Sequence, residues 1–234
     1  MKIALLGYGR MGKAIEKFAV DRGHTIVYVL DKEVEKGALS DSDVAINFSI
    51  PSAAVANIKA ALDHHIPVVC GTTGWLDQLE TIKAYTHKKE SAFLYASNFS
   101  IGVNLFFKIN AQVAQLMAPH KETYQAKMKE IHHIHKLDAP SGTALTLAEA
   151  ILKENMYNQW ELNGQNPDRL AIEAVREGEV PGTHSITYTS EVDSIQLTHE
   201  AFSRDGFALG AVIAAEWILG KKGNYSMQDV LNIP

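Results

Sequence analysis

The sequence predicts an α/β protein in which a Rossmann-type doubly wound parallel sheet carries an inserted α+β domain with an open mixed β-sheet. Short apolar segments alternate with amphipathic ones over the first hundred residues, and a glycine-rich turn follows the first of them. Longer alternating segments dominate the middle hundred. We expect a dinucleotide-binding domain at 1–100, completed by 206–234, and a substrate-binding and oligomerisation domain at 101–205.

The first strand, predicted at 3–6, leads directly into a dinucleotide fingerprint. The turn reads Gly7, Tyr8, Gly9, Arg10, Met11, Gly12, and an amphipathic helix follows at 13–20. In a G-x-G-x-x-G turn the first glycine permits the tight turn, the second lets a pyrophosphate approach the backbone, and the third packs helix against strand. A structural turn without a ligand is the alternative interpretation. The order of strand, fingerprint and helix favours a cofactor.

The second strand, predicted at 25–30, ends at Asp31, which lies 19 residues beyond Gly12. An acid at this place typically binds the ribose 2′-hydroxyl of NADH. Lys32 adds a positive charge that suits the 2′-phosphate of NADPH. We therefore expect NADH or NADPH as cofactor, with a preference for NADH.

Strands at 43–49, 67–70 and 92–96 alternate with helices at 51–64 and 76–88, as a parallel sheet requires. Ligands of such sheets bind beyond the carboxyl ends of the strands. Small, polar or aromatic residues lie at three of these ends, 47–49, 71–73 and 96–99, and three such segments at one edge favour a site for the nicotinamide and its ribose. From the last two ends we predict these cofactor contacts: Gly71, Thr72, Thr73, Ala96, Ser97, Asn98 and Phe99.

The middle of the chain changes character. A helix is expected at 102–117, then mixed alternation at 124–136, a helix at 142–153, a strand at 169–176 and a hairpin formed by 185–190 and 194–199. The last predicted helix, 210–219, is expected to pack on the nucleotide domain. The long alternating strands need a cover on their far face, which favours oligomerisation through the sheet.

The most distinctive segment is 130–146, where three histidines and a lysine lie between His132 and Lys136, shortly before Ser141, Gly142 and Thr143 open a helix. Three interpretations compete: metal ligation by His132, His133 and His135, exposed histidines without a function, and acid catalysis beside an anion site. A histidine delivers protons near neutral pH, and a helix N-terminus attracts carboxylates. No cysteine or acid stands at a familiar ligand spacing, so we predict no metal. If the segment were a regular strand, His132 and Lys136 would lie about 13 Å apart and would hold different parts of one ligand.

The composition excludes several functions. The chain has 234 residues and a net charge of −5, which gives no support to nucleic-acid binding. No apolar run has the length of a membrane span. A single cysteine and the lack of a signal-peptide pattern lead us to expect a cytoplasmic protein.

Segments along nearly the whole chain resemble the 4-hydroxy-tetrahydrodipicolinate reductase (dihydrodipicolinate reductase) family of lysine and diaminopimelate synthesis. The resemblance is carried by 7–12, 71–74, 97–104, 130–143, 176–178, 182–184, 199–204, 207–211 and 225–231. It implies catalytic roles for His132, a proton donor and acceptor, and for Lys136, a second proton donor. It also implies substrate contacts at His133, Gly142 and Thr143, and cofactor contacts at 7–12, Asp31, 71–73 and 96–99.

The implied reaction converts 4-hydroxy-tetrahydrodipicolinate, a small dicarboxylate, to tetrahydrodipicolinate with loss of water and transfer of a hydride from NAD(P)H. The resemblance also implies a cytoplasmic homotetramer. Two departures concern the cofactor: only about twelve residues separate Asp31 from the third strand, where relatives have a longer segment, and that strand ends in Asn47, Phe48 and Ser49 instead of Asp-Phe-Thr. Another amino-acid dehydrogenase and a non-catalytic dinucleotide sensor are the alternatives.

Overall fold

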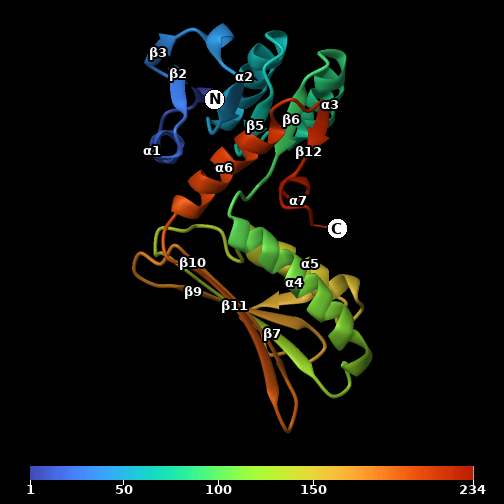
Figure 1. Ribbon diagram of the computed structural model, residues 1–234. Helices are drawn as coiled ribbons and strands as arrows, with labels where there is room; N and C mark the ends of the chain where they lie inside the picture. Colours follow the sequence, from blue (N-terminus) through green and yellow to red (C-terminus); the bar gives the residue numbers. More distant parts are fainter. Residues whose placement is uncertain (234) are drawn as a thin grey trace. The chain divides into compact units, whose positions relative to one another are not determined.

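The computed structural model describes residues 1–233, so the last residue of the predicted completion of the first domain, 234, lies outside them. The chain divides into two compact units (Figure 1). Unit 1 comprises residues 1–104 and those from 205 onward, and unit 2 comprises 105–204.

Unit 1 contains a seven-stranded sheet in the order β12-β6-β5-β4-β1-β2-β3. The strands are β1 (Lys2–Leu6), β2 (Thr25–Asp31), β3 (Val34–Gly37), β4 (Val44–Asn47), β5 (Val68–Cys70), β6 (Ala92–Tyr95) and β12 (Gly223–Tyr225). All neighbours pair in parallel except β2 and β3, which are antiparallel. The predicted doubly wound parallel sheet is confirmed.

Helices cover both faces of this sheet. The helices of unit 1 are α1 (Arg10–Asp21), α2 (Pro51–Asp63), α3 (Leu79–Lys88), α6 (Asp205–Ile218) and α7 (Met227–Val230), with short 3₁₀ turns at Leu39–Asp41 and Leu76–Gln78. Ile3 and Leu5 face α1 and α6, whereas Ala4 and Leu6 face the opposite layer with α2 and α3. Burial on both faces explains why the strands read as continuous apolar runs.

Unit 2 contains a five-stranded mixed sheet in the order β11-β10-β7-β9-β8. Its elements are β7 (Gln125–His132), α5 (Gly142–Lys153), β8 (Trp160–Leu162), β9 (Leu170–Arg176), β10 (Gly182–Thr189) and β11 (Ser194–Ala201). The helix α4 (Ile101–Met117) and the 3₁₀ turn Ala118–His120 precede them. The strand β7 is parallel to β9 and antiparallel to β10, so the predicted mixed sheet is confirmed.

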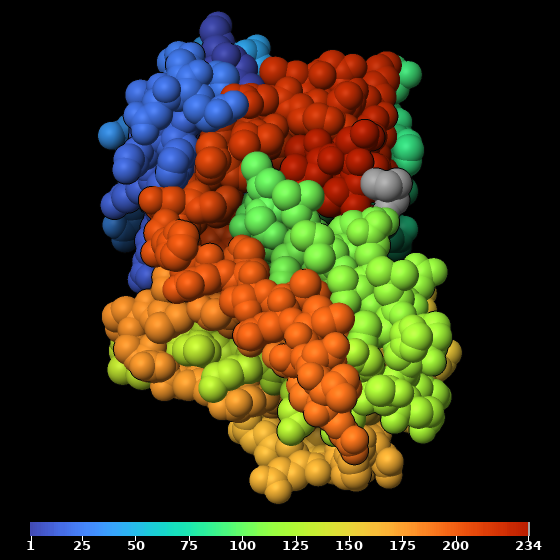
Figure 2. All heavy atoms as spheres, turned by 60° about the horizontal axis from the view of Figure 1, so that its bottom comes forward, coloured from blue at the N-terminus to red at the C-terminus, as the bar shows by residue number. Residues whose placement is uncertain are grey.

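The helices α4 and α5 cover one face of this sheet (Figure 1), and the amide of Asn110 on α4 donates to the carbonyl of Leu147 on α5 (2.9 Å). Side chains alternate along β7, so Ala126, Met128, Glu130 and His132 are all buried on the helix-covered side. The edge strand β11 is largely exposed, and the hairpin that contains it lies at the surface in Figure 2.

Several predicted boundaries were wrong. The strand β7 ends at His132, so the segment 124–136 is not one continuous strand, and a turn brings the Lys136 amide to the carbonyl of His133 (3.1 Å). The helix α6 begins at Asp205, five residues earlier than predicted. The strands β3, β8 and β12 were not predicted. The first of them and a 3₁₀ turn fill the short segment between Asp31 and β4.

Candidate active site

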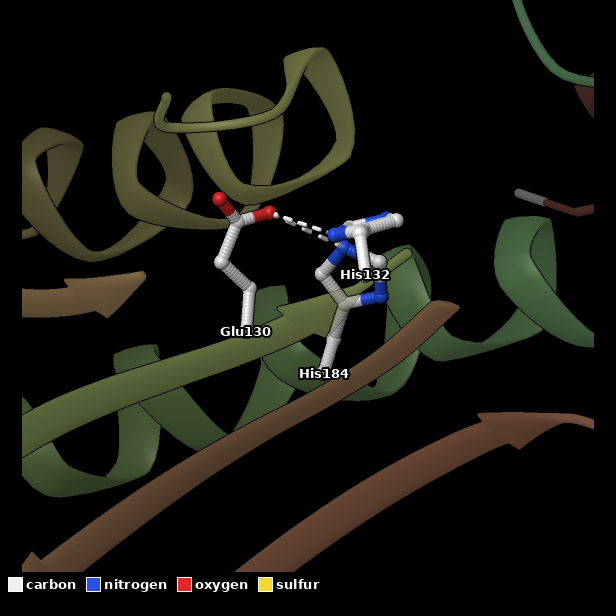
Figure 3. Close-up of side chains that lie close together, drawn as sticks. All are labelled: Glu130, His132 and His184. Atoms are coloured by element: carbon white, nitrogen blue, oxygen red, sulfur yellow. Dashed lines mark ion pairs between the residues drawn. The ribbon is translucent and has the colours of Figure 1, made fainter. Parts of the chain in front are cut away.

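The centre of the candidate site is the carboxylate of Glu130, which is fully buried on β7. One of its oxygens, Oε1, accepts from the backbone N–H of Ser141 (3.0 Å) and from Nη2 of Arg176 (3.1 Å). The other, Oε2, lies 3.0 Å from Nδ1 of His132 and 3.9 Å from Nε2 of His184 (Figure 3). The contact with His132 has an ion-pair distance but not the angle of a good hydrogen bond.

Strand pairing on both sides of β7 explains how distant residues reach this carboxylate, because β10 is antiparallel to β7 and β9 is parallel to it. On β10, His184 pairs directly with Glu130, and on β9, Arg176 pairs with His132. Directly opposed residues have neighbouring side chains. The rings of His132 and His184 are 5.0 Å apart and nearly perpendicular.

The electrostatics of the cluster favour an ionised Glu130 and a neutral His184. Burial opposes ionisation of Glu130, but its contacts with His132, Ser141 and Arg176 outweigh that effect and hold its pKa at about 2. Burial, assisted by the charge of His132, lowers the pKa of His184 to about 4. His184 Nε2 lies 3.1 Å from the hydroxyl of Ser141, which also caps α5 by accepting from the Ala144 amide.

The turn after β7 carries the predicted lysine. The ammonium of Lys136 lies 2.8 Å from both carboxylate oxygens of Asp138. Arg176 binds the backbone of the same turn, since its Nη2 donates to the Asp138 carbonyl (2.6 Å) and its Nε donates to the Lys136 carbonyl (3.4 Å). One guanidinium therefore joins Glu130 to the lysine-bearing turn.

The predicted substrate residues lie on both sides of this turn. The ring nitrogen Nε2 of His133 is 2.9 Å from Nη2 of Arg204, and burial together with that positive charge lowers the pKa of His133. Gly142 is the first residue of α5 and Thr143 the second. A Cβ added to Gly142 would meet nothing within 4 Å, so this helix end is open.

The metal interpretation does not match its predicted ligands. His135 is exposed and pairs with Glu179, and His133 contacts Arg204. Within the described residues, the group whose donor atoms lie within 4.8 Å of one another is instead Glu130, His132 and His184. The guanidinium of Arg176 beside that carboxylate would repel a cation. The absence of a metal stays a prediction.

A few of the predicted cofactor residues of unit 1 line a cavity of about 370 Å³ at the carboxyl ends of the strands. Of the predicted contacts, Gly7, Gly9 and Asp31 line it, together with Lys32, Leu30, Phe48, Ser49, Ile50, Ala53 and Asn57. The others do not line this cavity. Thr72 instead accepts from the Ser49 amide through its hydroxyl, and the Phe48 ring contacts Phe99 at 5.5 Å between centroids.

The glycine-rich turn fits a dinucleotide. Gly7 has φ +103°, and a Cβ there would lie 2.2 Å from the Phe48 carbonyl oxygen. A Cβ on Gly12 would lie 2.3 Å from the carbonyl oxygen of Gly7, whereas one on Gly9 would meet nothing within 4 Å. The first turn of α1 has neither an acidic residue nor a side-chain cap. Its free N–H groups and the open space at Gly9 suit a pyrophosphate.

The side chain of Asp31 is fixed by the backbone around it. Its carboxylate accepts from the backbone amides of Lys32 (2.7 Å) and Tyr8 (2.8 Å), and these bonds lower its pKa. Arg10 and Met11 are the first two residues of α1, directly after the glycine-rich turn. The residues present therefore fit NADH or NADPH.

Comparisons with known proteins decide the family. Residues 1–99 match the family described as dihydrodipicolinate reductase, N-terminus, and residues 102–231 match its C-terminus counterpart. The chain belongs to the dihydrodipicolinate reductase family. Membership makes it an NAD(P)H-dependent oxidoreductase of the diaminopimelate route to lysine, as the sequence predicted. It also disfavours the dehydrogenase and sensor alternatives.

Individual relatives agree over the full length. The chain is 52% identical to a 4-hydroxy-tetrahydrodipicolinate reductase of Christiangramia forsetii, covering 99% of this chain and 98% of the relative. It is 32% identical to the reductase of that name from Neisseria meningitidis, covering 100% and 98%. A dipicolinate-bound dihydrodipicolinate reductase from Paenisporosarcina sp. TG-14 has the same fold, with a TM-score of 0.81, 22% identity and 98% coverage of each chain.

Three residues of the site, Glu130, Arg176 and His184, had no role predicted from the sequence, although all three lie in segments that carry the family resemblance. The signal available was alternation, because Glu130 is two residues from His132 and must share its face.

No helix among the described residues is long and apolar enough to cross a membrane.

Proposed function

We propose that His132 and Lys136 catalyse the reaction of the family in this chain. That reaction reduces 4-hydroxy-2,3,4,5-tetrahydrodipicolinate to 2,3,4,5-tetrahydrodipicolinate, with water lost from C4. The bound nicotinamide supplies the hydride. The observation that carries the assignment is that His132 on β7 and the start of α5 meet at the Glu130 carboxylate, and that Arg176 joins the lysine-bearing turn to it.

His132 is the proton donor in this proposal. Its Nδ1 faces Glu130, so its other nitrogen, Nε2, is the one that reaches the substrate. A Cβ on Gly182 would lie 3.0 Å from that Nε2, so the glycine keeps the space beside it free. The ring is 7% exposed, which limits competition from water while leaving the proton accessible.

Lys136 binds a carboxylate of the substrate and serves as second proton donor. Its ion pair with Asp138 is partly exposed, and such pairs contribute at most about 1 kcal/mol, so an incoming carboxylate can displace or share it. His133, Gly142 and Thr143 contact the rest of the dicarboxylate. The Ser141 hydroxyl caps the Ala144 amide, and the positive end of the α5 dipole at Gly142 and Thr143 favours that negative charge.

The cofactor is bound by the fingerprint turn (Gly7, Tyr8, Gly9, Arg10, Met11, Gly12), by Asp31, by Gly71, Thr72 and Thr73, and by Ala96, Ser97, Asn98 and Phe99. NADH is preferred because the Asp31 carboxylate, fixed by two backbone amides, would repel a 2′-phosphate. Lys32 lines the same cavity and keeps NADPH usable.

Unit 2 is the substrate-binding and oligomerisation domain in this proposal, and the protein is a cytoplasmic homotetramer without nucleic-acid partners. The face of its sheet away from α4 and α5 is hollowed over about 1020 Å³ and lined by polar side chains such as Lys127, Lys129 and Thr187. Pairing of two such faces would fill the hollow. Light scattering after gel filtration tests the tetramer.

The activity test follows absorbance of NADH and NADPH with substrate made in situ by a dihydrodipicolinate synthase from pyruvate and aspartate semialdehyde. Oxidation that depends on the synthase supports the reductase, and the ratio of the two rates tests the NADH preference. Cofactor binding without oxidation would contradict it.

Two variants test the residue roles. His132→Gln should lower kcat about 100-fold with little change in KM, and Lys136→Ala should lower kcat and raise KM. The matched controls are His135→Gln, an exposed histidine of the same motif, and Lys88→Ala, an exposed lysine on α3. Unchanged kinetics for either test variant would remove that residue from the mechanism.

A further inference from the structure

We propose that Glu130 and Arg176 are positioning residues: the carboxylate fixes which nitrogen of His132 carries the proton, and the guanidinium fixes the turn that presents Lys136. This inference rests on the proposed catalytic roles of His132 and Lys136. One buried carboxylate would then position both proton donors, His132 at the end of β7 and Lys136 in the turn that follows.

The two oxygens of Glu130 have different partners, and this difference carries the argument. Oε1 is approached only by donors, the Ser141 amide and Arg176 Nη2. Oε2 lies 3.0 Å from Nδ1 of His132, at an ion-pair distance without hydrogen-bond angle, and 3.9 Å from Nε2 of His184. A carboxylate can only accept, so its negative charge at this distance favours a neutral His132 with the proton on Nδ1 and leaves Nε2 as the free nitrogen. After His132 gives up a proton from Nε2, it is already in the form that Glu130 stabilises.

The same geometry predicts what a neutral isostere would do. In Glu130→Gln, the amide oxygen must take the Oε1 position, because Ser141 and Arg176 both donate there. The NH₂ group then faces Nδ1 of His132 and can only donate. His132 would have to accept at Nδ1 and hold its proton on Nε2. The doubly protonated ring, which is the proton donor, would have no acceptor for its Nδ1–H.

Arg176 extends this control to the lysine. It lies 20% exposed beside Glu130 and donates to the carbonyl oxygens of Asp138 and Lys136. A planar guanidinium reaches these acceptors together, whereas the ammonium of a lysine is a single point charge. Arg176→Lys should therefore loosen the turn and leave the proton on His132 where it was.

The experiment measures the tautomer of the neutral His132 ring by ¹⁵N NMR over a pH series. The protein contains ten histidines, so the signal is assigned by its loss in His132→Gln. The wild-type protein should show Nδ1–H, Glu130→Gln should show Nε2–H, and Glu130→Asp, which keeps the charge, should show Nδ1–H. The matched control is Glu173→Gln, an exposed carboxylate on β9 that pairs with Lys129.

Kinetics give the second readout. Glu130→Gln should lower kcat about 100-fold and leave KM within about threefold, and Glu130→Asp should recover most of the loss. Arg176→Lys should raise KM for the dicarboxylate about tenfold with the Nδ1–H tautomer retained. A merely structural role would not change the tautomer.

The inference is overturned if wild-type His132 carries its proton on Nε2, or if Glu130→Gln keeps Nδ1–H or keeps kcat within twofold. If Glu130→Gln does not fold, judged by circular dichroism and thermal unfolding, the tautomer in wild-type and Glu130→Asp protein decides. A wild-type protein without synthase-dependent activity would contradict the proposed function instead, and the tautomer measurement would still test the positioning.

Discussion

Gly9 and Gly12 stand three residues apart in the glycine-rich turn, and replacing each by alanine should damage different properties. A Cβ on Gly9 would meet nothing within 4 Å, and its φ of −75° is open to alanine. The only loss to the fold is a poorer helix N-cap, about 1 kcal/mol or less. The added methyl group would occupy the space by which the pyrophosphate approaches, so the Kd for NADH should rise at least about tenfold.

Gly12→Ala should behave in the opposite way. Its Cβ would lie 2.3 Å from the carbonyl oxygen of Gly7, where ordinary contacts begin near 3.4 Å. The helix α1 or the turn must therefore move by about 1 Å. Overpacking of this size typically costs about 1–3 kcal/mol, which corresponds to a fall in Tm of several degrees, on the order of 5 °C.

Calorimetry of unfolding and titration of NADH fluorescence separate the two effects. The control is Gly206→Ala on α6, where the nearest atom to the added Cβ is a side-chain oxygen at 3.6 Å. It should keep both Tm and Kd. Equal loss of stability in Gly9→Ala and Gly12→Ala would refute the reasoning, because it would show that the two glycines meet the same steric demand.

Three further outcomes are expected. The hydroxyl of Tyr188 is buried without a partner in the described part of the chain, so Tyr188→Phe should raise the free energy of unfolding by about 1 kcal/mol in urea titrations. The hydroxyl of Tyr157 accepts from the Ala126 amide, so Tyr157→Phe should lower the free energy of unfolding by about as much. The folded-state pKa of Glu130, about 2, and of His184, about 4, both lie below their ordinary values of 4.5 and 6.5, so the unfolded chain binds protons first as the pH falls. Stability should decline from pH 6.5 downward through His184 and below pH 4.5 through Glu130, and a flat urea midpoint from pH 7 to pH 3 would contradict this. Asp31→Ala should weaken NADH about tenfold, by calorimetric titration, and weaken NADPH less, because the carboxylate that repels the 2′-phosphate is gone.

The sequence predicted those parts of the fold that local sterics determine. Gly7 and Gly12 are required by close backbone contacts, and the helix predicted at 142–153 has those bounds because Ser141 caps it. The strands β3, β8 and β12 have three or four residues, as β4, β5 and β6 do, but they lack the continuous apolar run that made those three recognisable. They are strands because a neighbouring strand offers hydrogen bonds, and that information is not local.

The site, like the fold, was predictable where its residues are adjacent in the sequence. The motif that contains His132 and Lys136 is contiguous, so it was recognised. Arg176 and His184 reach Glu130 only through strand register, 46 and 54 residues along the chain. Alternation places His184 on the buried face of β10, but it does not say which residue lies opposite. The turn after His132 was also hidden, because alternation continued in the sequence after the strand had ended.

The pairing of β12 with β6 has a consequence for synthesis of the protein on the ribosome. Unit 1 begins with the first residue to be translated, yet its sheet gains β12, and the face formed by Ile3, Leu5 and Leu94 gains α6, only after the whole of unit 2 has been translated. Unit 2 is contiguous and can complete its fold first. Until then the nascent nucleotide-binding unit exposes the apolar surface that α6 covers in the finished protein. A chain released at residue 204 would keep that surface exposed and would be prone to aggregation.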